Sequence, residues 1–185
     1  MIVTIHHRRS LRLKNYDYSK LGYYFITICT QNREHLCGEI VEGEMVLNVA
    51  GEMIHSLWFD IMNDFPNIVL HEFVIMPNHI HRIIEIVGAP LVGALDTENV
   101  VGTNDKRAPM KGAPTVGDMI GTFKSLTTNT YIKMVKKGTL PPFNQRIWQR
   151  NYYEHIIRDD EDYNRIAIYI INNPMRWDDD VLSKE

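Results

Sequence analysis

Two strand-forming runs, residues 68–76 and 78–87, follow each other in the chain with only Pro77 between them. Both runs are rich in the β-branched and aromatic residues that strands favour. Proline has no N–H group to donate to a sheet, so Pro77 marks a turn or the edge of a strand. We therefore expect the two runs to be neighbouring strands of one sheet.

The rest of the chain alternates between strand and helix patterns. Residues 23–30 and 44–47 indicate two further strands, and apolar residues recur at helical spacing in 48–66, 116–135 and 158–172. The order of these predicted elements leaves room for one more strand before the last helix. It predicts an α+β fold in which the helices pack on one face of an antiparallel sheet.

The composition fits a single globular domain spanning residues 1–185. Of the 185 residues, 44% are hydrophobic and 23% are charged, which excludes a disordered chain. No apolar run approaches the ~18 residues that a membrane span needs, and the polar, basic start lacks the apolar segment of a signal peptide. Cys29 and Cys37 form neither a disulfide framework nor a paired zinc motif. We therefore expect a cytoplasmic protein without a membrane partner.

Charge is distributed unevenly along the chain, although the net charge is only -3. Residues 1–30 carry five basic residues and one acidic residue, and residues 106–158 carry ten basic and two acidic residues. A basic N-terminal arm, about residues 1–20, would form with the later basic segment a positive face for a polyanion. Random clustering of charged residues on a solvated surface would explain the same residue counts. Residues 88–114 are rich in glycine and proline, and we expect a mobile loop there.

His79 and His81 stand two positions apart in the second strand-forming run. In a strand, residues i and i+2 point to the same face, separated by about two rises of ~3.3 Å, so both imidazoles can reach one ion. Neutral imidazole is a common ligand for divalent metals, and two protein ligands leave positions for a substrate phosphate. Two hydrogen-bonded structural histidines would give the same pattern.

Tyr169 lies outside the apolar stripe on a helical wheel of residues 158–172, and Asn173 falls near it on the same flank. A tyrosine beside an amide oxygen suits a nucleophile next to a metal ligand. A nearby cation would favour the phenolate, because the reference pKa of tyrosine is ~10. A surface tyrosine and a helix-ending Asn-Pro pair are ordinary features as well, and Pro174 biases Asn173 away from helical angles.

Three segments of the chain resemble one known family. They are RLKNYDYSKLGYYFITICTQNR (12–33), FVIMPNHIHRIIEI (73–86) and IWQRNYYEHIIRDDEDYNRIAIYIINNPMRW (147–177). Their most specific parts are MPNHxH, WQRxYxxHxxR and YIxxNP, in that order. With these motifs the chain resembles the REP-associated tyrosine transposases, within the single-tyrosine HUH group of single-strand DNA transposases. The resemblance covers nearly the whole chain, and residues 88–114 are its least characteristic part.

The resemblance implies a ferredoxin-like fold and a metal-dependent DNA transposase. His79 and His81 match the histidine-hydrophobic-histidine metal motif, Tyr169 matches the nucleophile, and Asn173 matches a third metal ligand. The implied cofactor is Mg²⁺ or Mn²⁺, both of which accept oxygen ligands. The implied reaction cleaves and rejoins single-stranded or hairpin DNA, such as REP-like palindromes, through a 5′-phosphotyrosine intermediate. Such an enzyme would associate with the nucleoid.

Basic and aromatic residues alternate in the segment 146–158, the composition expected of a groove for single-stranded nucleic acid. The four basic residues of the N-terminal arm would contact a hairpin stem or its guide sequence. A packed hairpin with an exposed arginine explains the later segment equally well. The candidate DNA-binding residues are Arg8, Arg9, Arg12, Lys14, Arg146, Trp148, Arg150, His155 and Arg158.

Several alternatives stay open at the level of the sequence. Tyr152 and Tyr153 compete with Tyr169 for the role of nucleophile. A non-catalytic module that binds hairpin DNA or RNA on a ferredoxin-like sheet would share the fold, and a metal-dependent hydrolase would use water as the nucleophile. The DNA target is open, and so is the choice between a monomer and a homodimer with shared sites.

Overall fold

The computed structural model describes residues 20–87, 115–180 and 182–183. The expected basic N-terminal arm, except for Lys20, and the expected loop at 88–114 lie outside the described residues. None of the helices in the described part of the chain is long and apolar enough to cross a lipid bilayer.

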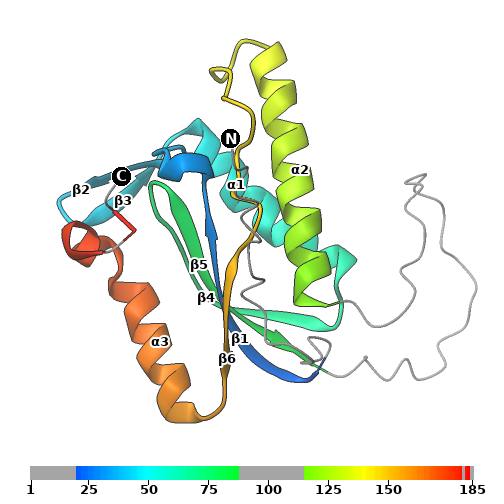
Figure 1. Ribbon diagram of the computed structural model, residues 1–185, viewed down its shortest axis with the longest axis vertical. Coiled ribbons are helices and arrows are strands. Elements are labelled where there is room, and N and C mark those ends of the chain that lie inside the picture. Colours follow the sequence, from blue (N-terminus) through cyan, green and yellow to red (C-terminus); the bar gives the residue numbers. More distant parts are fainter. Residues whose placement is uncertain (1–19, 88–114, 181, 184–185) are drawn as a thin grey trace, which may run out of the picture.

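A four-stranded antiparallel sheet forms the centre of the molecule, and a separate two-stranded hairpin lies at one end of it (Figure 1). The strands of the sheet occur in the spatial order β4-β5-β1-β6, and each neighbouring pair is antiparallel. β4 and β5 are the two runs on either side of Pro77, which are therefore neighbouring strands as predicted. The strands are β1 (Gly22–Cys29), β4 (Ile68–Ile75), β5 (His79–Ile86) and β6 (Tyr153–Ile157), and the hairpin pairs β2 (Gly38–Val41) with β3 (Glu44–Leu47).

Each of the three α-helices in the described part of the chain begins at a polar residue that caps its first turn. The side chain of Asn48 accepts hydrogen bonds from two backbone N–H groups of the first helix, Thr115 and Asp118 form a capping box, and Asp159 caps the third helix. The helices are α1 (Val49–Asp60), α2 (Val116–Lys136) and α3 (Asp160–Asn172). Three short 3₁₀ helices also occur: η1 (Gln31–Arg33) after β1, η2 (Ile61–Asp64) after α1 and η3 (Pro174–Asp179) after α3.

The order of the elements confirms the ferredoxin-like α+β prediction. β1, α1 and β4 form one β-α-β unit and β5, α2 and β6 form a second one, and the strands of the two units interleave in the sheet. α1 and α2 cover the same face, as expected. α3 differs from the prediction because it packs on the opposite face (Figure 1).

The position of α3 follows from the composition of the central strands. Along β1 and β5, the side chains on one face of the sheet pack against α1 and α2. The opposite face carries Phe25 and Ile83. Ile166 and Ile170 of α3 pack on these two side chains in a second, smaller core. Because both faces of the central strands carry apolar residues, the sheet is covered on both sides. α3 therefore lies directly above the face that carries the two histidines.

Candidate active site

His79 and His81 point to the same face of β5, toward α3, and both are buried. The centroids of the two imidazole rings lie 4.4 Å apart. His81 pairs across the sheet with Thr27, and His79 pairs with Cys29. The strand therefore brings the two rings together as the i, i+2 spacing predicts.

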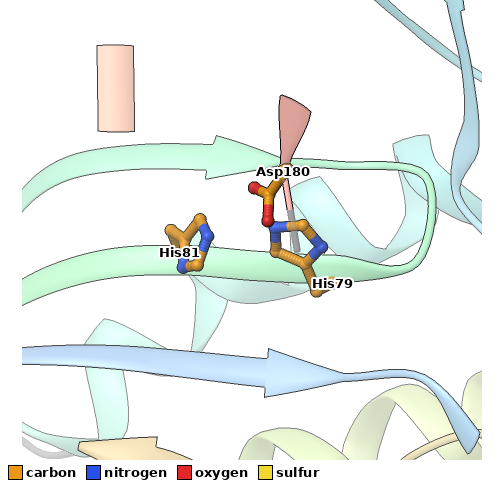
Figure 2. Close-up of side chains that lie close together, drawn as sticks. All are labelled: His79, His81 and Asp180. Carbon is orange, nitrogen blue, oxygen red and sulfur yellow. The ribbon is translucent and has the colours of Figure 1, made fainter. Parts of the chain in front are cut away.

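Asp180 joins the two histidines from the C-terminal segment that follows η3. Figure 2 shows its carboxylate directed at the two imidazoles. One ligand atom from each of the three residues lies within 4.8 Å of the others, and all three side chains are buried. Sequence reasoning did not identify Asp180, since it ends a run of three aspartates, and nothing in that run marks which one turns inward.

Hydrogen bonds at Nδ1 orient both imidazole rings. Nδ1 of His79 donates to the amide oxygen of Asn78 at 2.8 Å, and Nδ1 of His81 lies 2.8 Å from the hydroxyl of Thr27. The Asn78 amide is itself held, because its nitrogen donates to the carbonyl of Leu182 at 2.9 Å. An Nδ1 engaged in this way leaves Nε2 as the ligand atom, the arrangement common around metal-bound histidines.

Both histidines are in the neutral, ligating form at neutral pH. Burial lowers the pKa of His79 to about 4, against a smaller opposing effect of the Asp180 charge. Burial lowers the pKa of His81 well below its ordinary value, and the neighbouring His79 lowers it further. Neutral imidazole is the form that binds a metal ion.

Asn173 lies next to the cluster and is 1% exposed. Its backbone angles, φ -59° and ψ -41°, are helical despite the following Pro174, so its side chain stays on the flank of Tyr169. The amide nitrogen donates to Oδ2 of Asp180 at 2.9 Å. The amide raises the pKa of His79 and lowers that of Tyr169, in each case as a smaller effect than burial.

A divalent cation fits the chemistry of this donor set. Nε2 of His79 and Oδ1 of Asn173 are buried and have no hydrogen-bond partner among the described residues. Leaving such atoms unsatisfied costs about 1–3 kcal/mol each, and a bound cation would satisfy both. Two neutral nitrogens with carboxylate and amide oxygens form a mixed set that suits a divalent transition metal.

The hydroxyl of Tyr169 lies at the edge of the cluster. It is 3.1 Å from Nε2 of His81 and donates to Oδ2 of Asp180 at 3.3 Å. Burial and the negative charge of Asp180 raise the pKa of Tyr169 to about 12, and a hydrogen bond from Asn173 partly opposes them. Tyr169 is still 38% exposed, so it remains accessible from the surroundings.

The other tyrosines on α3 and near the cavity occupy different positions. Tyr163 lies toward the far end of α3, where its hydroxyl donates to a carboxylate oxygen of Glu72 at 2.8 Å. Tyr152 and Tyr153 line the same cavity as Tyr169. Among these tyrosines, Tyr169 is the one whose hydroxyl lies 3.1 Å from a ring nitrogen of His81.

A cavity of about 640 Å³ opens beside the cluster, between α3 and β6. Phe25 forms part of its floor, and its ring stacks on that of His81 with a centroid distance of 5.2 Å. Arg33, His155 and Arg165 contribute basic groups to the walls. A cavity of this size holds a ligand as large as a nucleotide.

The candidate DNA-binding residues are scattered. Arg146, Arg150 and Arg158 are exposed, and His155 lines the cavity while its Nε2 lies 2.7 Å from Oδ2 of Asp162. Trp148 corrects the sequence prediction: it is 4% exposed, and its indole nitrogen donates to the buried Thr127 hydroxyl at 2.9 Å, so it offers no face for base stacking. The residues that lie outside the described part are Arg8, Arg9, Arg12 and Lys14.

Comparison with known proteins gives a relative in sequence and likenesses among solved structures. The chain is 42% identical over 186 residues to an uncharacterized protein of Haemophilus influenzae, covering 96% of this chain and 94% of the relative. A solved structure of a REP-associated tyrosine transposase bound to a REP hairpin superposes with a TM-score of 0.51 and 19% identity, over 89% of this chain and 73% of that one. No family model matches the chain.

These two likenesses differ in what they establish. The first, at 42% identity over nearly both full lengths, establishes common descent. The second, at 19% identity, establishes the fold. The chain therefore belongs to the same family as the Haemophilus influenzae protein, and its fold is that of the REP-associated tyrosine transposases.

Proposed function

We propose that the protein is a metal-dependent DNA strand-transferase that cleaves and rejoins single-stranded or hairpin DNA through Tyr169. The single observation that carries the proposal is the position of the Tyr169 hydroxyl, 3.1 Å from Nε2 of His81 at the edge of a candidate metal cluster. The solved REP-associated transposase that shares the fold was bound to a REP hairpin, which supports DNA as the substrate.

His79 and His81 would hold the cation through Nε2, and Asp180 and Asn173 would supply oxygen ligands. Mn²⁺ suits this mixture of nitrogen and oxygen, and Mg²⁺ is the second candidate. When bound, the ion would act as a Lewis acid that stabilises charge on the scissile phosphate. It would also lie close to the phenol of Tyr169 and favour its ionised form, which burial and Asp180 oppose.

Tyr169 would attack the phosphorus atom in line with the bond to the departing 3′ oxygen. The phenolic proton passes to Oδ2 of Asp180, which already accepts it in a hydrogen bond of 3.3 Å. The new bond joins the tyrosine oxygen to the 5′ phosphate, and the P–O3′ bond breaks to leave a 3′ hydroxyl that takes up a proton. The reverse step rejoins the strand, so no external energy source is required.

One chain supplies every group of the proposed site. His79 and His81 come from β5, Tyr169 from α3, and Asp180 from the segment after η3 of the same chain. We therefore propose that a monomer is competent for cleavage and that a homodimer, if it forms, need not share active-site residues.

The test is the formation of a covalent protein–DNA adduct. The full chain is incubated with Mn²⁺ and a hairpin oligonucleotide that carries single-stranded flanks on both sides. We expect an adduct that resists denaturant and disappears in Tyr169→Phe. Tyr152→Phe and Tyr153→Phe are the matched controls, because both residues line the same cavity, and both should retain the adduct.

Other outcomes of the same assay would overturn the proposal. An adduct that persists in Tyr169→Phe would assign the nucleophile elsewhere. Free 5′-phosphate products without any adduct would indicate a hydrolase that uses water. Hairpin affinity without cleavage, unchanged by a chelator, would indicate a binding module.

A further inference from the structure

His155 and Asp162 form a histidine–carboxylate pair at the cavity beside Tyr169. Nε2 of His155 lies 2.7 Å from Oδ2 of Asp162, and this contact joins β6 to the first turn of α3 (Figure 1). His155 lines the cavity together with Tyr169. Neither member of the pair belongs to the candidate metal cluster.

Asp162 holds the imidazole of His155 from a fixed position. Its backbone N–H donates to Oδ1 of Asp159 at 2.8 Å, and its own Oδ1 accepts a hydrogen bond from Arg165. The hydrogen bond from His155 is the largest of the effects that lower the pKa of Asp162, so the carboxylate is ionised at neutral pH. A carboxylate bonded to one imidazole nitrogen fixes the tautomer and the orientation of the ring.

Nδ1 is the nitrogen of His155 that remains for a ligand. Within the described residues, Nε2 is the ring nitrogen of His155 that is hydrogen-bonded. His79 and His81 show the opposite arrangement, since their Nδ1 atoms are engaged and Nε2 is left for a metal ion. The side chain of His155 is 38% exposed, so a substrate in the cavity can reach it.

Phe25 connects His155 to the proposed nucleophile. It pairs with His155 across the sheet, so the two side chains share a face. Its ring stacks on that of His81 and meets that of Tyr169 edge to face, with centroid distances of 5.2 and 6.2 Å. His155 therefore lies one side chain away from the contact between Tyr169 and His81. The two proposed reactants come from the two elements that border the cavity, Tyr169 from α3 and His155 from β6.

The proposed reaction needs a proton for the departing oxygen. In an in-line displacement, the 3′ oxygen leaves on the side of the phosphorus atom opposite to the nucleophile, and an acid that protonates it there lowers the barrier. Asp180 lies on the side of the nucleophile, where it accepts a hydrogen bond from Tyr169. Histidine exchanges a proton near neutral pH, so it can give a proton in cleavage and take it back in rejoining.

We propose that His155 is the general acid that protonates the departing 3′ oxygen, and that Asp162 is the positioning residue that orients it. When the P–O3′ bond breaks, its electron pair goes to O3′, and the Nδ1 proton of His155 passes to that oxygen to give the 3′ hydroxyl. In rejoining, neutral His155 takes the proton back as O3′ attacks the phosphotyrosine. The inference rests on the proposed function and names the proton donor that it requires, a chemical role beyond the DNA contact expected from the sequence.

The experiment replaces the departing oxygen by sulfur. The phosphate that the wild-type chain cleaves is located from the length of the released fragment, and a second hairpin is made with sulfur in place of the bridging 3′ oxygen at that phosphate. Its leaving group is a thiolate, which departs without an acid because the reference pKa of a thiol is only ~8.5. Rates of adduct formation are measured with Mn²⁺ at saturating concentrations of each hairpin.

His155→Gln is the main variant, because its amide can still donate a hydrogen bond to Asp162 but has no proton to give to O3′. We expect adduct formation on the oxygen hairpin to slow by about 10²–10⁴-fold. On the sulfur hairpin, the variant should react at nearly the wild-type rate. Asp162→Asn should show the same pattern with a smaller loss, because the proton donor is present but less well oriented.

His71→Gln is the matched control. Nε2 of His71 lies 3.1 Å from Oε2 of Glu85, a similar histidine–carboxylate pair, but His71 is not among the residues that line the cavity. This variant should react at the wild-type rate on both hairpins.

Equally slow reaction of His155→Gln on both hairpins would overturn the inference, because a damaged fold or a lost DNA contact does not distinguish oxygen from sulfur. An unchanged rate on the oxygen hairpin, or a defect that disappears at saturating DNA, would overturn it as well. In all of these cases the wild-type adduct leaves the proposed function standing. A wild-type chain that forms no adduct on the oxygen hairpin would reject the proposed function itself, and the inference with it.

Discussion

The hydroxyl of Tyr169 lies 3.1 Å from Nε2 of His81, although 88 positions separate the two residues in the chain. Their rings share a neighbour, Phe25 of β1, which stacks on His81 and meets Tyr169 edge to face with centroids 6.2 Å apart. Ile166 and Ile170 anchor α3 on the same face. The contact between Tyr169 and His81 therefore depends on the packing of the second core.

Replacement of Asp180 should impair both metal binding and cleavage. Asp180→Asn keeps the shape but removes the charge and the proton acceptor for Tyr169, so we expect metal affinity to fall at least about tenfold and adduct formation to fall further. Metal affinity is measured by calorimetric titration with Mn²⁺, and the adduct by denaturing electrophoresis. Asp179→Asn is the matched control, because Asp179 is the exposed neighbour in the same run. Equal behaviour of the two variants would remove Asp180 from the site.

A divalent cation should stabilise the folded protein through His79. At a concentration of one hundred times its dissociation constant, a ligand that binds only the native state adds about 2.7 kcal/mol to the free energy of unfolding, or about 5–10 °C in the unfolding temperature. We expect this shift with Mn²⁺, its loss on adding EDTA, and its absence in His79→Ala. His55→Ala, on an exposed face of α1, should keep it. A shift of full size in His79→Ala would argue against the histidine cluster as the binding site.

Thr27 should tune the metal affinity without touching the metal. Its hydroxyl lies 2.8 Å from Nδ1 of His81 and is buried, so Thr27→Val removes the hydrogen bond at nearly constant shape. Loss of such a supporting bond typically costs about 10–100-fold in metal affinity, and we also expect about 1–3 kcal/mol less stability from the unsatisfied imidazole. Thr27→Ser should restore the affinity, and a purely steric role of Thr27 would show itself as a failure of this rescue.

The metal-free protein should lose stability between pH 7 and pH 5. His79 has a pKa of about 4 in the folded protein, below the ~6.5 of an unfolded chain. Between these values the unfolded state binds more protons than the folded state, so the free energy of unfolding rises with pH and falls on acidification. The contribution of His79 alone is about 2 kcal/mol over this interval. Urea unfolding in EDTA at the two pH values should show this loss, and His79→Gln should reduce it. An unchanged pH dependence in the variant would contradict the role of His79.

The periodicity of the sequence and local backbone geometry were sufficient to predict much of the fold and half of the candidate site. Runs of β-branched and aromatic residues indicated the strands on either side of Pro77, and helical spacing indicated the three helices, because both signals depend on residues close in sequence. The i, i+2 spacing alone placed His79 and His81 on one face of a strand. The i, i+4 spacing placed Asn173 beside Tyr169, and its helical angles preserve that arrangement.

Features that depend on contacts between distant segments of the chain were decided only by the tertiary structure. α3 covers the face opposite to α1 and α2 because the central strands are apolar on both sides, which the pattern of a single helix does not reveal. Trp148 is buried because Phe123 and Thr127 of α2 surround its indole, although its sequence neighbours suggested an exposed ring.

The amino-acid sequence by itself determined which residues form strands and helices and which side chains share a face, since both follow from the fixed geometry of the backbone. Only the folded chain decided that Asp180, and not one of the two aspartates before it, completes the group around His79 and His81. The reason is physical: the turn after η3 and its hydrogen bonds to Asn173 and Tyr169 select one carboxylate for burial, and those partners lie on elements that meet only when the sheet and α3 have packed.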